Sequence, residues 1–235
     1  YLSSALMLKS LFFIRGKKNA VKTIYLFDEL TLNFETTHFA FLPDKVLQKS
    51  YFSYSLKSIL KYNFSNKLLW QKDFTNDIAK IEVWNEKVVV IELYDAHTIV
   101  ALSSDDGQLL WEQSGWLLHV YDNAIYMIYN PDPNILIVKK TDAVSGSVIN
   151  YDLSEILKQN QLLGETMQYT VVDNLIYFSF FYKKIVTIIN LETLQLQWLH
   201  EIQTDASWIK EPGVEGNRLY VLDSNQTLHI FEKEL

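Results

Sequence analysis

A repeat of about forty residues runs through this chain and constrains its fold more than any other feature. Its first marker is a hairpin signature, in which an apolar residue, a short polar turn and an alternating apolar run follow one another. Because Asn, Asp and Gly tolerate the positive φ of a tight hairpin turn, each copy predicts two paired strands. The copies are Val83–Val90, Val120–Met127, Val171–Phe178, Val214–Val221 and, more loosely, Phe41–Gln48.

A second marker follows about 25 residues downstream in each unit, where a polar turn leads into a strand that ends in tryptophan. Ser65–Trp70, Asp106–Trp111 and Glu192–Trp198 carry it, and Ser145–Asn150 fills the same place without a tryptophan. The first two tryptophans lie one period apart, and the third follows after about two more. Two markers that advance in step indicate a structural repeat.

Each unit predicts four short strands, as the third unit shows. Its predicted strands are Ile78–Trp84, Lys87–Leu93, Thr98–Ser103 and Gln108–Trp111. Four-stranded sheets that stack face to face around an axis leave only short, protected edges when the ring closes. We therefore predict an all-β fold, a β-propeller built of four-stranded antiparallel blades.

The repeat divides a single predicted domain, residues 1–235, into six units. The N-terminal unit is diverged, with predicted strands Leu11–Ile14, Thr23–Phe27 and Leu30–Phe34, and the last unit stops at Thr227–Phe231, before a fourth strand. We predict a six-bladed ring in which an N-terminal strand completes the last blade. Five blades, an incomplete ring and part of a longer propeller are the alternatives. The units are 1–36, 37–76, 77–115, 116–165, 166–206 and 207–235.

One unit carries an insertion that predicts a short helix near residues 152–164. Asp152–Glu155 has the form of a capping box, Ile156–Leu163 can form two helical turns, and Gly164 supplies a stop.

Composition narrows the class of protein and of partner. The net charge of -7 disfavours nucleic acid, because phosphate binding needs clustered Lys and Arg. The chain has 0 cysteines, which excludes disulfides and thiolate chemistry but leaves the compartment open between cytoplasm and periplasm or envelope. The apolar segment Tyr1–Ile14 is interrupted by Lys9 and is too short to span a bilayer, and its charge order is the reverse of a signal peptide.

At Asp106–Trp111, preceded by Thr98–Leu102, the sequence resembles the pyrroloquinoline-quinone-type repeat, whose strand-ending Trp docks against the neighbouring blade. Asn66–Trp70 and Leu191–Trp198 are weaker copies, and the resemblance covers roughly Phe39–Leu235. The quinone enzymes of that family use a vicinal cysteine pair, bound calcium and an acidic base. None of these finds a match here, so the resemblance implies the non-enzymatic branch, which presents loops to other proteins. WD-repeat and kelch patterns fit less well, since no Trp precedes an Asp and no Gly-His or Gly-Gly dipeptide occurs.

A search for catalytic or metal-binding groups finds none that converge. The five histidines are scattered singly, and Asp95 with His97 is the best acid/base pair, which we interpret as an ordinary polar turn. Asp105 and Asp106 supply two ligands where calcium needs six or more. We predict no catalytic residue, no metal and no cofactor.

Loop residues and repeat-phased tryptophans provide the remaining predictions. We expect Trp70, Trp111 and Trp198 to pack between blades. Blade-to-blade connections and loops joining second to third strands emerge on one face of a propeller, and aromatic and charged residues there are typical of protein interfaces. The residues expected on that face are Tyr94, Asp95, His97, Trp116, Asp132, Tyr182, Lys183, Trp208 and Asp223.

The leading hypothesis is a non-catalytic scaffold that binds another protein, in the form of a bacterial immunity protein or an envelope-assembly factor. The alternative is a carbohydrate-binding or hydrolytic propeller that uses its central channel.

Overall fold

The computed structural model describes residues 2–8, 11–18, 21–28, 33–37, 45–47, 49–94, 96–122 and 124–232, and before residue 45 it describes only the strands. The chain forms two compact units, one of residues 1–96 with 100–109 and the other of residues 97–99 with 110–235. No helix in the described part of the chain is long and apolar enough to cross a membrane.

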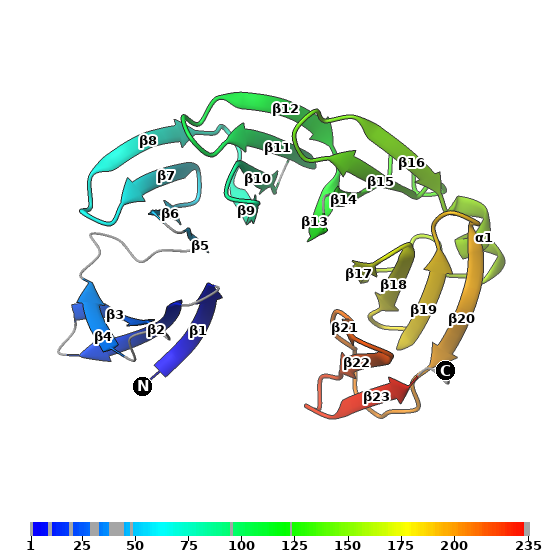
Figure 1. Ribbon diagram of the computed structural model, residues 1–235. Coiled ribbons are helices and arrows are strands. Elements are labelled where there is room, and N and C mark those ends of the chain that lie inside the picture. The colour runs from blue at the N-terminus through cyan, green and yellow to red at the C-terminus, as the bar shows by residue number, and fades with distance from the viewer. Residues whose placement is uncertain are drawn as a thin grey trace. The chain divides into compact units, whose positions relative to one another are not determined.

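The first three sheets each have four antiparallel strands that pair in chain order (Figure 1). The first sheet contains β1 (Leu2–Leu8), β2 (Leu11–Lys18), β3 (Val21–Asp28) and β4 (Asn33–Thr37). The second contains β5 (Lys45–Val46), β6 (Ser50–Tyr54), β7 (Ser58–Asn63) and β8 (Leu68–Asp73). The third contains β9 (Ile78–Trp84), β10 (Val88–Leu93), β11 (Thr98–Ser103) and β12 (Leu109–Ser114).

The described residues after β12 form two further four-stranded sheets and one of three strands. The fourth sheet contains β13 (Trp116–Tyr121), β14 (Ala124–Tyr129), β15 (Ile137–Asp142) and β16 (Val148–Asp152), and the helix α1 (Ser154–Gln159) follows it. The fifth contains β17 (Met167–Val172), β18 (Leu175–Phe180), β19 (Ile185–Asn190) and β20 (Gln195–Glu201). The last contains β21 (Gly213–Glu215), β22 (Arg218–Leu222) and β23 (Leu228–Glu232).

The predicted hairpins are confirmed in four sheets, where each polar turn joins the first strand to the second. Two-residue turns connect the pairs Tyr121↔Ala124, Val172↔Leu175 and Glu215↔Arg218. Asp122 and Asp173 have φ of 51° and 54° in these turns, and Gly216 has 59°. Turn chemistry therefore sets the register of the sheets, because only residues that tolerate positive φ close such short loops. The four strands predicted for the third unit are likewise found.

Three sequence-based expectations need correction. The loose hairpin copy at Phe41–Gln48 was placed too early in the sequence. The first strand of the observed hairpin is β5, and the Leu47 N–H donates to Ser50 O (2.8 Å) to close the turn that follows it. Residues 41–44 and 48 lie outside the described residues. The helix ends at Gln159 rather than at Gly164. Leu153 is its N-cap, and Asp152 instead accepts a hydrogen bond from the Ser154 N–H (2.9 Å), which turns the chain before the helix begins.

The third correction concerns the last sheet. β1 pairs with its sequence neighbour β2 in a sheet of its own, and β21, β22 and β23 form a sheet of three strands in the described residues. No N-terminal strand pairs with the last sheet among the described residues, so the predicted completion of that sheet is not found, and the six-bladed closed ring stays a prediction.

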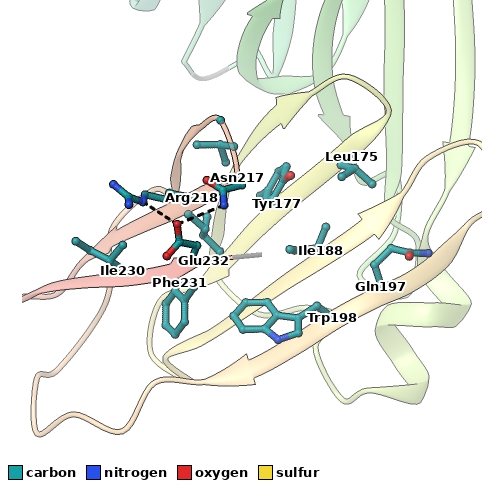
Figure 2. A pocket seen from close by; sticks show the side chains of 13 residues that line it. Leu175, Tyr177, Ile188, Gln197, Trp198, Asn217, Arg218, Ile230, Phe231 and Glu232 are labelled. Atoms are coloured by element: carbon teal, nitrogen blue, oxygen red, sulfur yellow. Dashed lines mark hydrogen bonds and ion pairs between the residues drawn. The ribbon is translucent and has the colours of Figure 1, made fainter. Parts of the chain in front are cut away.

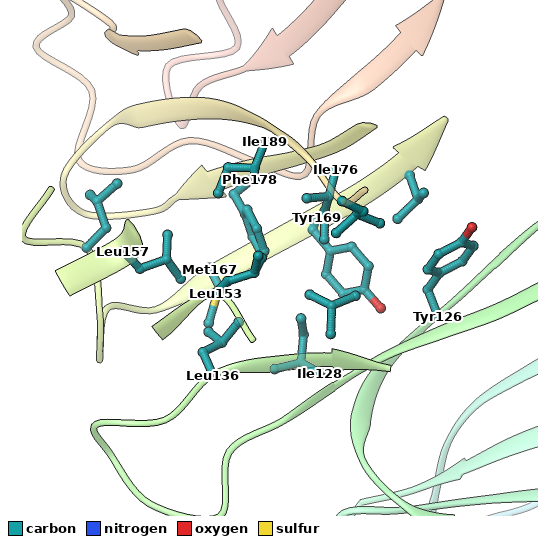
Figure 3. Close-up of a cluster of buried hydrophobic side chains, with 14 of the residues drawn as sticks. Tyr126, Ile128, Leu136, Leu153, Leu157, Met167, Tyr169, Ile176, Phe178 and Ile189 are labelled. Atoms are coloured by element: carbon teal, nitrogen blue, oxygen red, sulfur yellow. The ribbon is translucent and has the colours of Figure 1, made fainter. Parts of the chain in front are cut away.

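Apolar side chains fill the space between neighbouring sheets within each compact unit. The largest cluster joins the fourth and fifth sheets, and Leu157 of α1 packs into it beside Leu136 and Leu153 (Figure 3). Its aromatic members are Tyr126, Tyr169, Phe178 and Phe180. A second cluster, around Phe52, Trp70 and Val89, joins the second and third sheets. Burial in the interior of stacked sheets explains the continuous apolar runs of β10, β14 and β18.

Candidate functional site

Trp70 lies on the outer strand β8 and contacts the turn between β11 and β12 of the next sheet. Its indole Nε1–H donates to Ser104 O (2.9 Å), and Gly107 sits against the ring so closely that a Cβ there would lie 2.8 Å from it. Trp70 as a whole is only 9% exposed. We call this arrangement, an outer-strand tryptophan bonded to a carbonyl and covered by a glycine of the following turn, the tryptophan–turn contact.

Trp111 on β12 makes the same contact one repeat later. Its Nε1–H donates to Ala143 O (2.9 Å), and a Cβ on Gly146 would lie 2.7 Å from the indole Cγ. The acidic-Gly and Ser-Gly turns of the repeat thus place glycine where no side chain fits. Trp198 on β20 differs, because it stacks on His200 (5.3 Å between centroids) and meets Phe231 of the last sheet edge-on (5.3 Å).

Lys61 lies beside the Trp70 contact, and its role was not predicted from the sequence. Its ammonium is buried and donates to Ser104 O (2.6 Å) and Ser104 Oγ (3.1 Å), with the Phe52 ring 5.6 Å away. Burial lowers the pKa of Lys61, and the charges of Asp105 and Glu86 offset part of that effect. The carbonyl of Ser104 therefore ties both the outer strand and the strand beside it to the next sheet.

The loops that join second to third strands carry the most exposed large apolar side chains of the described residues. Leu56 is 71% exposed, Tyr94 69% and Tyr182 68%, and Ile135 in the corresponding loop of the fourth sheet reaches 36%. We call the four segments 55–57, 94–97, 130–136 and 181–184 the anchor loops. Leu56 and Ile135 were missed in the sequence, where only aromatic and charged residues were sought; their shared position in the repeat was the available signal.

In the first compact unit, hydrogen bonds to the segment that connects the second and third sheets fix the backbone of the anchor loops. Leu56 O accepts the Ile78 N–H (2.6 Å), and Asp77 O accepts the Tyr94 N–H (2.8 Å). The two exposed side chains therefore project from loops that are bonded to one common segment.

In the second compact unit, hydrogen bonds to the segment that connects the fourth and fifth sheets likewise fix the anchor loop 181–184. The Phe181 N–H donates to Thr166 O (3.0 Å), and the Lys183 ammonium donates to Gln161 O (2.6 Å) and pairs with Glu165 (3.3 Å). Lys183 thus secures its own loop, while Tyr182 beside it is exposed. Rigid loops with exposed aromatic residues lose little conformational entropy on binding.

The other predicted face residues group around aromatic pairs. His97 and Trp116 lie edge-on with centroids 6.1 Å apart, and the Gly115 N–H bonds His97 O (2.7 Å). Trp208 lies 6.5 Å from the Phe181 ring, and the Lys210 ammonium lies 5.9 Å above Trp208. Asp95 lies outside the described residues.

Two predicted aspartates are engaged in hydrogen bonds within the chain. Asp132 is exposed and accepts bonds from the Asn134 N–H (2.8 Å) and amide group (3.1 Å). Asp223, expected on the binding face, is instead fully buried. Its carboxylate accepts bonds from Thr204 Oγ1 (2.9 Å) and the N–H groups of Asn225 and Thr227 (2.9 Å each), and it pairs with His229 Nε2 (2.9 Å).

These bonds stabilise the ionised form of Asp223 and offset the opposing effect of burial. The His229 contact contributes most, and the pKa of the carboxyl falls to about 2. His229 and Asp223 thus form a closed structural network that orders the turn between β22 and β23. No group of three or more His, Cys, Asp or Glu residues that could hold a metal occurs within the described residues.

The repeated antiparallel sheets and tryptophan–turn contacts define a β-propeller built of pyrroloquinoline-quinone-like repeats. The family model described as outer membrane protein assembly factor BamB matches residues 55–234. The chain therefore belongs to the BamB family of repeat propellers.

Solved structures share the fold at low sequence identity. BamB from Moraxella catarrhalis is 12% identical, with a TM-score of 0.51 over 95% of this chain and 82% of that one. Hsv2 from Kluyveromyces lactis is 10% identical, with a TM-score of 0.65 over 98% and 74%. The WD40 propeller domain of Doa1 is 16% identical, with a TM-score of 0.58 over 100% and 79%. No curated protein matches the sequence.

Proposed function

We propose that this protein is a non-catalytic scaffold that binds another protein through its anchor loops. One observation carries the proposal: loops at the same position in the second, third and fifth sheets present Leu56, Tyr94 and Tyr182 at 68–71% exposure. Loops positioned by a regular scaffold often carry binding residues, and tyrosine is enriched at protein interfaces. Aromatic residues held on ordered loops are the usual centres of binding energy in protein interfaces.

Family membership favours one version of this function. The family is described as an outer membrane protein assembly factor, which supports an envelope-assembly partner over the immunity role. The net charge of -7 suits a partner with a basic contact surface.

A capture experiment with matched variants tests the proposal. The purified chain, a variant with Leu56→Ser, Tyr94→Ser and Tyr182→Ser, and a control variant serve as bait in a lysate of the source organism. The control replaces three apolar residues of the outer strands that are 40–55% exposed: Leu69→Ser, Leu110→Ser and Ile149→Ser.

The expected result is one stoichiometric partner that binds the wild type and the control but not the anchor-loop variant. Loss of three anchors should weaken binding at least a hundredfold, since each contributes about 1–2 kcal/mol. A partner lost only from the control variant would place the interface on the outer strands. The absence of any stoichiometric protein would contradict the scaffold function.

A further inference from the structure

The hydroxyl group of Tyr126 on β14 is a polar group that the fold does not use. The residue is only 2% exposed and packs in the largest apolar cluster, but its hydroxyl points away from the other members (Figure 3). Tyr169 of the same cluster donates its hydroxyl hydrogen to Leu117 O (2.6 Å), whereas the Tyr126 hydroxyl has no hydrogen-bond partner among the described residues. Burial raises the pKa of Tyr126, and the charges of Tyr121 and Asp122 raise it further, so the hydroxyl keeps its proton and can donate it.

Lys140 on β15 carries a second unused polar group beside Tyr126. The two residues pair across the strands, and the ammonium lies 5.9 Å from the centroid of the tyrosine ring. Lys61 pairs with Phe52 in the same position of the second sheet, 5.6 Å from its ring, and donates two hydrogen bonds to Ser104. The Lys140 ammonium has neither a hydrogen-bond acceptor nor an ion-pair partner within the described part of the chain.

The fifth sheet shows that the repeat does not need a charge at this position. There Tyr177 pairs with Ile188, whose aliphatic side chain takes the place of the ammonium (Figure 2). The fourth sheet therefore carries an ammonium group that neither packing nor an internal hydrogen bond explains.

Both unused groups belong to residues that line one polar cavity, bounded by the fourth sheet and the β17–β18 turn of the fifth. Its volume is about 610 Å³, within the range of about 300–1,000 Å³ of small-molecule sites. Asp173 of the turn accepts a hydrogen bond from the Tyr121 hydroxyl (3.0 Å), and the Asn174 amide nitrogen donates to Glu192 Oε1 (2.8 Å). All of these residues lie within the second compact unit, so the cavity does not depend on the placement of the first.

We infer that this cavity binds a neutral saccharide through adjacent hydroxyl groups. The Tyr126 hydroxyl and the Lys140 ammonium are hydrogen-bond donors, and the Asp173 carboxylate and the Asn174 carbonyl are acceptors. Each sugar hydroxyl both donates and accepts, so neighbouring hydroxyls can bridge the two sets. An anion would face the carboxylates of Asp122 and Asp173, and a cation would face the ammonium, whereas an uncharged polyol avoids both repulsions.

A nuclear magnetic resonance titration of the isotopically labelled full chain tests the inference. The probes are maltose, cellobiose, lactose and diacetylchitobiose, each added separately. We expect saturable binding of at least one disaccharide, with shifts of the backbone amides of Tyr126, Lys140, Asp173 and Asn174. Retention of the chain on insoluble cellulose or chitin would identify a polysaccharide as the source of the sugar, and binding of disaccharides alone would identify a free saccharide; both support the site.

Two variants and their matched controls make the result specific. Tyr126→Phe removes only the unbonded hydroxyl, so it should weaken binding about threefold to tenfold and leave Tm unchanged. Lys140→Met keeps the aliphatic stem and should weaken binding about tenfold or more, because hydrogen bonds from charged groups are stronger. Tyr151→Phe and Lys158→Met, which change residues outside the cavity, should bind as the wild type does.

This site is separate from the anchor loops, which follow the second strands of the sheets, whereas the turn of Asp173 and Asn174 precedes β18. The anchor-loop variant should therefore bind the disaccharide with wild-type affinity, so this inference and the proposed function fail independently.

The opposite results overturn the inference. Absence of saturable binding by all of the disaccharides, or shifts confined to residues outside the cavity, would exclude a saccharide site there. Wild-type affinity in both Tyr126→Phe and Lys140→Met would exclude the two unused groups as its donors. Binding of inorganic phosphate at the same residues, without binding of any disaccharide, would assign the cavity to an anion instead.

Discussion

Replacing Gly146 with alanine tests whether the tryptophan–turn contact holds neighbouring sheets together. Gly146 has φ of 70°, so alanine pays a backbone cost of roughly 1–2 kcal/mol for the left-handed conformation alone. The added methyl group would also lie 2.7, 2.8 and 2.9 Å from Cγ, Cβ and Cδ1 of Trp111. Carbon atoms in contact prefer separations of about 3.5–4.0 Å, so the methyl group forces a displacement.

Trp111 cannot easily make room, because the residue is only 8% exposed and its indole N–H is bonded to Ala143 O. Overpacking of a filled site costs about 1–3 kcal/mol, so we expect Gly146→Ala to destabilise the protein by about 2–5 kcal/mol in total. Gly216→Ala is the matched control, since Gly216 has φ of 59° and a methyl group added there would have nothing within 4 Å. It should lose only the backbone contribution of roughly 1–2 kcal/mol.

Urea unfolding of both variants, followed by circular dichroism, measures the difference. A second comparison introduces Gly146→Ala into a Trp111→Leu background, where the collision is relieved and the added loss should shrink to the backbone contribution. Equal losses for Gly146→Ala and Gly216→Ala would refute the proposed docking of the indole on the glycine. So would an undiminished loss in the Trp111→Leu background.

Three further predictions concern buried polar groups. The pKa of Asp223 is lower in the folded chain than in the unfolded chain, so its stabilising contribution is complete above roughly pH 5 and is lost as the pH falls toward about 2. Asp223→Asn should therefore flatten the dependence of Tm on pH across that window, with Asp132→Asn as the control for the lost charge. Thr187 Oγ1 is buried without a hydrogen-bond partner in the described residues. Thr187→Val should therefore raise the free energy of unfolding, measured by urea titration, by about 1–2 kcal/mol. A free energy of unfolding below that of the wild type would contradict the absence of a partner. Lys61→Met keeps the packed aliphatic stem and leaves Ser104 O bonded to Trp70, so the variant should retain or exceed the wild-type Tm. Lys61→Ala removes the stem as well and should lower the free energy of unfolding by about 2 kcal/mol. Equal destabilisation of the two variants would show that the ammonium itself is stabilising.

The fold was largely predictable because turn chemistry and apolar periodicity are local. The strand pairs around Asp122, Asp173 and Gly216 follow from residues that tolerate positive φ, and the spacing of Trp70 and Trp111 revealed the repeat. The hairpin of β5 was misplaced because Pro43 and Asp44 form a turn signal that competes with the real turn after Leu47. Local signals alone could not decide between the two positions.

The candidate site was harder to predict because exposure depends on neighbouring segments. Asp223 belongs to a polar loop, yet Thr204 and His229 enclose its carboxylate, and no local pattern shows this. Leu56 was not singled out in the sequence, but its loop holds it 71% exposed. Tyr94 and Tyr182 were found because they occupy equivalent loops of the repeat.

The tryptophan–turn contact also sets an order for folding during synthesis. Trp70 and its acceptor Ser104 are separated by 34 residues, and Trp111 and Ala143 by 32. At a translation rate of about 5–20 residues per second, each outer-strand indole waits roughly two to seven seconds for its covering turn. A newly synthesised sheet therefore exposes apolar side chains on the side that will face the next sheet until that next sheet has been made. The chain gains stability in steps, as each sheet packs on its neighbour. Slowing synthesis between a tryptophan codon and its turn would extend the interval in which a chaperone can bind that indole.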